Sequence, residues 1–303
     1  MTKSVAVIGA GAVGSYFGGM LARAGFPVTL IGRHAHVHAI ERTGLFIDGV
    51  RIKEHVKVAA STELESARDA DVVLFCVKTL DTEHAAKAMA PHLKESALVL
   101  SLQNGVDNAE RIRNATGIEA ISTVVYVGAA IPQPGTVKHA GAGHLVVGDR
   151  PRRTEIEDVA AMFEAAEVPT RISEHIDIEL WTKFHLNVAA NAISALTGAN
   201  YGRIAADERC WALMETLTQE VMAVAAAHGV RLDEKKLLEG IVMISKAIPE
   251  ATSSTAQDIA RGRPTEMDSL NGYVVKLAAG AGIPVPVNQT LYALVKLLEE
   301  RKA

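Results

Sequence analysis

The sequence predicts a doubly wound α/β domain, with a mostly parallel sheet and small antiparallel additions, followed by an all-α domain. A glycine-rich turn joins an apolar run to a helix pattern near the start, strand and helix patterns alternate to about residue 173, and strand patterns nearly vanish beyond it. Alternating strands and helices are typical of a parallel sheet. At roughly 150 residues per domain, 303 residues are enough for two domains, which we place at residues 1–173 and 174–303.

The composition is that of a globular protein, with 49% hydrophobic and 22% charged residues. A net charge of −4 offers no basic surface for nucleic acid. Two uncharged windows, residues 4–22 and 184–202, are long enough to span a bilayer, but glycines interrupt the first and asparagines the second. We therefore expect a cytoplasmic protein without nucleic-acid or membrane partners.

The two cysteines, Cys76 and Cys210, lie far apart in the chain. We expect both to be free thiols, and neither to form a disulfide or a metal site.

The chain opens with the pattern of a nucleotide-binding unit. Residues 4–8 form a β-branched run, a Gly-x-Gly-x-x-Gly turn follows at once, a helix pattern runs to about residue 24, and a second strand pattern covers residues 27–31. This order is the context that the dinucleotide fingerprint requires. A glycine-rich turn without a ligand is the alternative reading.

Each part of the turn has a physical role in holding a dinucleotide. Gly9 permits the tight turn, Gly11 lets the backbone approach a pyrophosphate, and Gly14 lets the helix pack on the strand. Ala12 and Val13 stand at the helix N-terminus, which supplies an anion site. These five residues are candidate cofactor contacts.

The end of the second strand distinguishes the two nicotinamide cofactors. A site that prefers NAD usually carries Asp or Glu about 20 residues beyond the glycines, whereas this chain has Ile31-Gly32-Arg33-His34. A guanidinium group suits the 2′-phosphate of NADP. We therefore expect NADP(H), held by Arg33. A solvated surface arginine is the alternative.

Two further polar residues follow predicted strands. Residues 71–77 and 97–101 read as buried strands, and Lys78 and Asn104 come after their carboxyl ends. Ligands of doubly wound folds bind at that edge of the sheet. Both residues are therefore cofactor candidates, although each type is also common in turns and salt bridges.

Antiparallel additions are expected at two places. Asp48-Gly49 between apolar residues is typical of a two-residue hairpin turn. Strand patterns at residues 119–130 and 135–149 flank a turn that contains Pro132 and Pro134.

One helix of the second domain has an unusual polar face. Residues 179–198 place apolar side chains mostly at helical spacing, while Lys183, Asn187 and Asn191 stand four residues apart and share one face. Asparagine is a poor helix-interior residue, because its amide competes for backbone hydrogen bonds. The face is either a polar seam hydrogen-bonded to another helix or a proton donor flanked by two amides that hold a polar substrate.

A polar stretch, residues 252–268, separates two predicted helices of this domain. It combines hydroxyls, both charge signs, glycine and proline. Either Ser253 or Ser254 is placed to cap a short helix, and Thr265 to cap the long helix predicted from residue 267, with Asp268 completing a capping box. The functional reading is a loop that supplies hydroxyl and carboxylate contacts to a substrate.

With these motifs together, the chain resembles the ketopantoate reductase (2-dehydropantoate 2-reductase) family nearly from end to end. The Lys-x3-Asn-x3-Asn helix, together with the Ser-Ser-x3-Asp and Arg-x2-Glu-x-Asp segments, is the specific feature. The resemblance implies a Rossmann domain followed by a helical domain. It also implies NADPH-dependent reduction of 2-dehydropantoate to (R)-pantoate, a step in pantothenate and coenzyme A biosynthesis.

The resemblance further implies roles for individual residues. Lys183 matches the general acid, and Glu266 matches the glutamate that assists it and holds substrate. The substrate-binding positions are matched by Asn187, Asn191, Ser254 and Asn104, and the cofactor positions by Arg33, Lys78, Asn104, Gly9, Gly11, Ala12, Val13 and Gly14. Thr255 stands where many members have Met, in a loop that faces the substrate in the family. This departure leaves the identity of the acid open.

The expected reduction of a carbonyl group explains why a lysine, Lys183, would stand at the site. Hydride transfer to a carbonyl places negative charge on its oxygen, which needs a protonated donor within hydrogen-bond reach. Lysine is protonated at neutral pH, and a nearby carboxylate such as Glu266 keeps it so. Two alternatives remain: an NADP-dependent reductase of another branched 2-keto or hydroxy acid, and a non-catalytic protein that senses NADP(H). The sequence does not distinguish a monomer from a homodimer.

Overall fold

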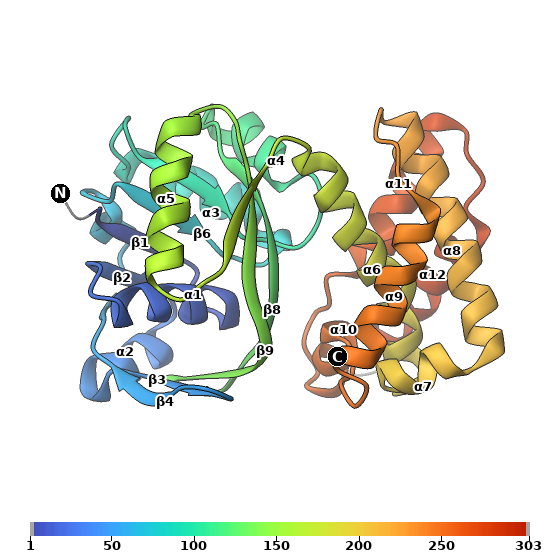
Figure 1. Ribbon diagram of the computed structural model, residues 1–303, viewed down its shortest axis with the longest axis horizontal. Helices are drawn as coiled ribbons and strands as arrows, with labels where there is room; N and C mark the ends of the chain where they lie inside the picture. The colour runs from blue at the N-terminus through green and yellow to red at the C-terminus, as the bar shows by residue number, and fades with distance from the viewer. Residues whose placement is uncertain (1–2, 301–303) are drawn as a thin grey trace. The chain divides into compact units, whose positions relative to one another are not determined.

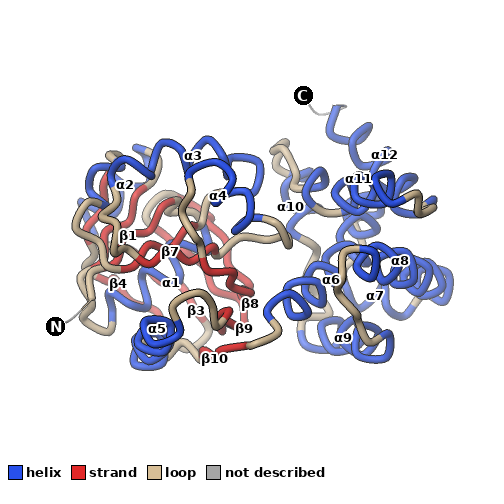
Figure 2. The backbone as a smooth tube through the Cα atoms, turned by 90° about the horizontal axis from the view of Figure 1, so that it is seen from above, coloured by secondary structure: helices blue, strands red, loops and turns tan. Residues whose placement is uncertain are grey.

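The structure, a computed structural model, describes residues 3–300. The chain divides into two compact units between Ile176 and Asp177. The first contains a sheet and the second is helical, as Figures 1 and 2 show.

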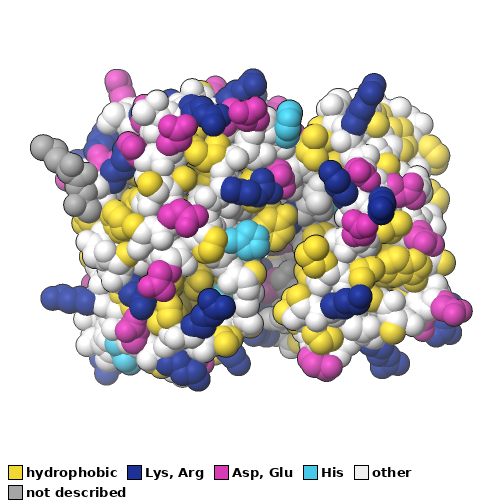
Figure 3. Space-filling model, in the orientation of Figure 1, with side chains coloured by type: hydrophobic (Ala, Val, Ile, Leu, Met, Phe, Trp, Pro, Cys, Tyr) yellow, Lys and Arg dark blue, Asp and Glu magenta, His cyan; other side chains and the backbone are white. Residues whose placement is uncertain are grey.

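Among the helices within residues 3–300, none has the length and apolar character that a membrane span requires. On the face seen in Figure 3, basic side chains alternate with acidic ones and do not gather in one patch.

Ten strands form the sheet of the first unit: β1 (Val5–Ile8), β2 (Val28–Ile31), β3 (Leu45–Gly49), β4 (Lys53–Val56), β5 (Ala59–Ser61), β6 (Val72–Phe75), β7 (Leu98–Ser101), β8 (Ile121–Gln133), β9 (Thr136–Gly148) and β10 (Thr170–Ser173). Their order is β4-β3-β9-β8-β7-β6-β1-β2-β5, and β10 pairs with β9. The strands from β7 to β5 in this order are parallel, whereas β8 pairs antiparallel with β9 and β3 with β4. This topology confirms the predicted doubly wound sheet with antiparallel additions.

Helices cover both faces of the central strands. Val7 of β1 packs in a cluster with Phe17, whereas its neighbour Ile8 packs in a second cluster with Met89. Successive residues of a strand point to opposite faces, so strands buried on both sides need the continuous apolar runs that the sequence contains. The helices of this unit are α1 (Ala12–Arg23), α2 (His34–Thr43), α3 (Thr82–Met89), α4 (Asn108–Thr116) and α5 (Arg153–Ala165).

The hairpin of β3 and β4 forms as predicted, but the predicted turn residues were wrong. Gly49 N–H donates to the Ile52 carbonyl at 2.7 Å, which leaves Val50 and Arg51 as the turn. Asp48 instead stays in β3, opposite Lys53, with 3.2 Å between the charged groups. Pairing of β3 with β9 as far as Gly49 also extends this strand.

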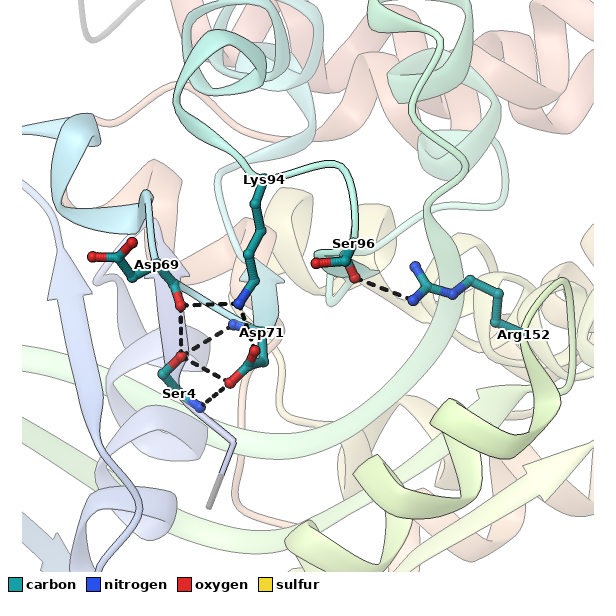
Figure 4. A network of polar contacts seen from close by, with 6 residues as sticks. All are labelled: Ser4, Asp69, Asp71, Lys94, Ser96 and Arg152. Carbon is teal, nitrogen blue, oxygen red and sulfur yellow. Dashed lines mark hydrogen bonds and ion pairs between the residues drawn. The ribbon is translucent and has the colours of Figure 1, made fainter. Parts of the chain in front are cut away.

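A charged network holds the amino ends of β1, β6 and β7 (Figure 4). Asp71 accepts hydrogen bonds from Lys94 Nζ at 2.5 Å and from the Ser4 backbone N–H at 2.8 Å. These hydrogen bonds lower the pKa of Asp71 to about 2. Arg152 donates to the Ser96 carbonyl at 3.1 Å. The polar groups of the network therefore satisfy one another at this amino edge of the sheet.

The second unit consists of helices α7 (Tyr201–Ala206), α8 (Glu208–Ala227), α9 (Glu234–Ala247), α10 (Ser254–Ala260), α11 (Asn271–Ala281) and α12 (Pro286–Glu300), together with nearly all of α6 (Ile176–Thr197). Pro286 is the first residue of α12, a position where its missing N–H costs no helical hydrogen bond. Glu220 of α8 accepts from the backbone N–H groups of Val287 and Asn288 at 2.9 and 3.0 Å, which ties the start of α12 to α8.

Candidate active site

Four neighbouring parallel strands, β7, β6, β1 and β2, end at the same edge of the first unit. The glycine turn follows β1, Arg33 follows β2, Lys78 follows β6 and Asn104 follows β7. The predicted cofactor residues thus lie along one edge, where doubly wound folds bind their ligands. Arg33 and Lys78 are exposed there.

The glycine turn leaves open space at only one of its three glycines. Gly9 has φ of +99°, and a Cβ there would lie 2.8 Å from the Val77 nitrogen, while a Cβ on Gly14 would lie 2.3 Å from the Gly9 oxygen. The packing of the protein itself therefore requires these two glycines. A Cβ on Gly11 would meet nothing within 4 Å among the described residues. The absence of a side chain at Gly11 thus fits the close approach of a ligand.

The N-termini of two helices at this edge suit negatively charged groups. Among the described residues, no side chain caps α1 or α2, and neither helix has an acidic residue in its first turn. Gly11 is the N-cap of α1 and Arg33 is the N-cap of α2. A helix N-terminus favours an anion. The two helix N-termini are therefore positions that suit the phosphate groups of a dinucleotide.

Buried Gln103, which the sequence analysis missed, supports the ends of β6 and β7. Its Nε2 donates to the Val77 carbonyl at 3.1 Å and to Thr82 Oγ1 at 2.8 Å. The neighbouring Asn104 carbonyl accepts from Thr79 Oγ1 at 2.8 Å. A polar residue next to a predicted strand end was the only signal, and it did not reveal which groups the side chain would join.

A second missed residue, His36, links α2 to the glycine turn. Its Nδ1 accepts from the Gly135 N–H at 3.0 Å, so the neutral ring carries its proton on Nε2 and donates to Ser15 Oγ at 3.0 Å. Ser15 in turn donates to the Ala10 carbonyl at 3.2 Å. Burial lowers the pKa of His36, which favours this neutral form.

In the second unit, α6 buries most of its apolar residues, Ile178 being an exposed exception, and leaves Lys183 partly exposed. Burial lowers the pKa of Lys183 to about 8, while the negative charge of Glu266 acts in the opposite direction. Glu266 precedes a single 3₁₀ turn, η4 (Met267–Ser269). An ammonium group whose pKa lies near neutral pH, with a carboxylate close by, is suited to donating a proton.

The two asparagines on the same face of α6 differ in their surroundings. Asn187 is partly exposed, and its side chain has no hydrogen-bond partner within residues 3–300. Asn191 is 2% exposed, and its Oδ1 accepts from the Tyr201 hydroxyl at 3.3 Å. The face is therefore not a continuous seam bonded to one neighbouring helix. This difference favours the reading of a ligand-binding face.

The polar stretch at residues 252–268 is attached to this face through Ser253. Its hydroxyl donates to the Asn191 carbonyl at 3.2 Å and accepts from the Ala256 N–H at 3.0 Å, which caps α10 as predicted for one of the two serines. Ser254, at the first position of α10, is exposed. Thr255, in the loop that the resemblance places toward the substrate, is only 2% exposed.

The capping box predicted at Thr265 and Asp268 is wrong for the long helix, because α11 begins only at Asn271; the Thr265 hydroxyl instead accepts from the Met267 N–H at 3.2 Å, at the start of η4. The Thr265 N–H donates to Glu299 at 3.0 Å. Asp268 accepts from the Tyr292 hydroxyl at 2.5 Å and from Lys296 at 2.9 Å. Both residues of the predicted capping box, Thr265 and Asp268, therefore form hydrogen bonds with side chains of α12.

Comparisons with known proteins agree with these features over the whole chain. Residues 5–152 match the family described as ketopantoate reductase PanE/ApbA, and residues 175–299 match its C-terminal part. The 2-dehydropantoate 2-reductase of Pyrococcus abyssi is 35% identical over 96% of each chain. The crystal structure of a PanE/ApbA family ketopantoate reductase from Ralstonia eutropha JMP134 is 47% identical, covers 99% of each chain and has a TM-score of 0.93.

A more distant enzyme shares the fold. The structure of a D-mandelate dehydrogenase with NADH and anilino(oxo)acetate has a TM-score of 0.91 at 23% identity, with 99% of each chain covered. The ketopantoate reductase family itself reduces ketopantoate to pantoate and uses NADPH.

Proposed function

We propose that this chain, which belongs to the ketopantoate reductase family, reduces ketopantoate to (R)-pantoate with Lys183 as the general acid. The observation that carries the proposal is the match to the family over both parts of the chain, together with a lysine on α6 that lies near the carboxylate of Glu266 and whose pKa burial lowers to about 8. A general acid works best when its pKa lies near the working pH. Lys183 meets this condition and shares a helix face with two amides.

The residues of the second unit would handle the keto acid. Bound NADPH would supply the hydride to the carbonyl carbon of the substrate. Negative charge then develops on the carbonyl oxygen. Lys183 Nζ donates a proton to that oxygen, while Glu266 keeps a larger share of the lysine protonated. Asn187, Asn191 and Ser254 offer neutral hydrogen-bonding groups for the carboxylate and hydroxyl oxygens.

The residues of the first unit would hold the cofactor. Gly9, Gly11, Ala12, Val13 and Gly14 form the pyrophosphate site, and Arg33 binds the 2′-phosphate. Lys78 and Asn104 stand at the next two strand ends, and Asn104 is also assigned to substrate. The protein is proposed to act as a monomer or a homodimer, and a related ketopantoate reductase from Staphylococcus aureus is described as dimeric.

The cofactor assignment is tested by Arg33→Ala. Loss of a charge-assisted hydrogen bond costs about 1.5–3 kcal/mol, so the KM for NADPH should rise about 10- to 100-fold. The KM for NADH, which lacks the 2′-phosphate, should change less than about twofold. Equal effects on both cofactors would remove Arg33 from the phosphate site.

The substrate assignment is tested with a panel of 2-keto acids. NADPH oxidation, followed by absorbance, should show the highest kcat/KM for ketopantoate, ahead of 2-oxoisovalerate, 2-oxoisocaproate and benzoylformate. A higher kcat/KM for one of the other acids would reassign the substrate and keep the chemistry. NADPH binding without oxidation on every acid would favour a sensing protein instead.

A further inference from the structure

Tyr201, at the start of α7, contacts the substrate-binding face of α6. Its hydroxyl lies 3.3 Å from Asn191 Oδ1. Burial raises the pKa of Tyr201 to about 12, so the phenol keeps its proton throughout the working pH range. Oδ1 offers only lone pairs. Tyr201 is therefore the donor and the Asn191 oxygen the acceptor.

This hydrogen bond determines which end of the Asn191 amide remains available. With Oδ1 engaged by Tyr201, the Nδ2 group at the other end of the planar amide is the end left for a ligand. Nδ2 has no hydrogen-bond partner within residues 3–300. An amide without the phenol could turn over and present its oxygen instead, because the two ends have nearly the same shape.

The surrounding backbone holds Tyr201 and Asn191 in place. Tyr201 N–H donates to the Ala251 carbonyl at 3.0 Å, two residues before the Ser253 cap. Ser253 in turn donates its hydroxyl to the Asn191 carbonyl at 3.2 Å and its N–H to Ser194 Oγ at 3.1 Å. The start of α7, the start of α10 and the middle of α6 are thus cross-linked around Asn191.

We propose that Tyr201 is a positioning residue that orients the Asn191 amide, so that the site presents an N–H donor and selects substrates with an oxygen acceptor at that point. This inference rests on the proposed function. It deepens that function, because it assigns acid selectivity to Tyr201 rather than to Thr255. The favoured acceptor is a carboxylate oxygen, since hydrogen bonds to charged groups are the stronger ones.

The main test is Tyr201→Phe, which keeps the ring and removes the donor. The KM for the best keto acid should rise about tenfold, as expected for one hydrogen bond. The kcat should change less than about threefold, and the Kd for NADPH should stay at the wild-type value. Tyr292→Phe, which removes another phenol hydroxyl of the same unit, is the matched control and should leave this KM unchanged.

A double-mutant cycle separates positioning from a purely structural role. In an Asn191→Ala background, Tyr201→Phe should raise the KM no further, because the amide that it orients is absent. Asn191→Asp should be worse than Asn191→Ala, because its carboxylate still accepts from Tyr201 but repels a substrate carboxylate. Additive effects in the cycle, an unchanged KM in Tyr201→Phe, or an Asn191→Asp variant better than Asn191→Ala would each overturn the inference.

The outcomes also distinguish this inference from the proposed function. A wild-type protein that reduces ketopantoate, combined with any of those three results, overturns the role of Tyr201 alone. A wild-type protein that reduces no acid of the panel overturns the proposed function, and the substrate role of Tyr201 with it.

Discussion

Two lysines of the second unit, Lys183 and Lys296, meet carboxylates from the same short segment and differ in acidity. Burial lowers the pKa of Lys183 to about 8, with Glu266 opposing the shift through its charge. Burial also acts to lower the pKa of Lys296, but hydrogen bonds to Glu299 and Asp268 outweigh it and raise the pKa. The distances from Lys296 Nζ to these carboxylates are 2.7 and 2.9 Å.

The difference shows how one segment can support both a structural cation and a titrating acid. A lysine hydrogen-bonded to two carboxylates stays charged at every working pH, so it can stabilise the fold but cannot readily release a proton. A lysine whose burial outweighs one nearby charge can do so near neutral pH. Glu266 and Asp268 stand two positions apart, and the tertiary structure directs each to a different lysine.

The strongest test of the comparison is to remove each lysine in turn. Lys183→Ala should lower kcat at least about 100-fold, because general acid catalysis contributes roughly 10²–10⁴ in rate. NADPH titration should show unchanged cofactor binding. Lys296→Ala should keep kcat within about threefold of wild type. Comparable kcat losses in the two variants would break the distinction between them.

Removing the carboxylates should give a smaller contrast of the same kind. Glu266→Gln should lower kcat about tenfold and raise the KM for the keto acid, because the carboxylate assists the acid and is assigned to substrate. Asp268→Asn should change both constants less than about threefold. Steady-state kinetics at saturating NADPH checks both variants. An effect of Glu266→Gln on cofactor affinity alone would contradict its placement.

The pH dependence of reduction should reveal the titration of Lys183. Proton donation requires the ammonium form, so kcat/KM should be level below the pKa of about 8 and fall tenfold per pH unit above it. Because Glu266 raises this pKa, Glu266→Gln should move the fall to lower pH. A profile that stays level to pH values well above 9 would show that Lys183 is not the titrating acid.

The smallest effect concerns stability. Lys296→Met should lower the free energy of unfolding by about 1 kcal/mol, since partly exposed ion pairs contribute modestly. Thermal unfolding at low and high salt measures it, and the difference from wild type should shrink as salt rises. Lys183→Met should instead raise Tm, because it removes a desolvated charge. A Tm decrease for Lys183→Met as large as that for Lys296→Met would contradict the contrast.

Most strand and helix positions could be predicted from local pattern, and the misses share one cause. The capping box at Thr265 and Asp268 failed because only a single 3₁₀ turn follows Thr265 and because Tyr292 and Lys296 of α12 engage Asp268. The turn of the first hairpin moved because Asp48 pairs with Lys53 and because β9 extends the strand. In each case a residue distant in the chain, or one on the neighbouring strand, outweighed the local preference for a cap or a turn.

The order of strands and helices, the glycine turn and the shared face of Lys183, Asn187 and Asn191 could all be predicted from the residues alone. Each of these follows from spacing along the chain, which helix and strand geometry converts directly into position. The acidity of Lys183 and the contact of Tyr201 with Asn191 arise only in the folded chain. Acidity depends on burial and on nearby charge, and hydrogen bonds depend on which distant segments meet. Spacing along the chain determines neither of these.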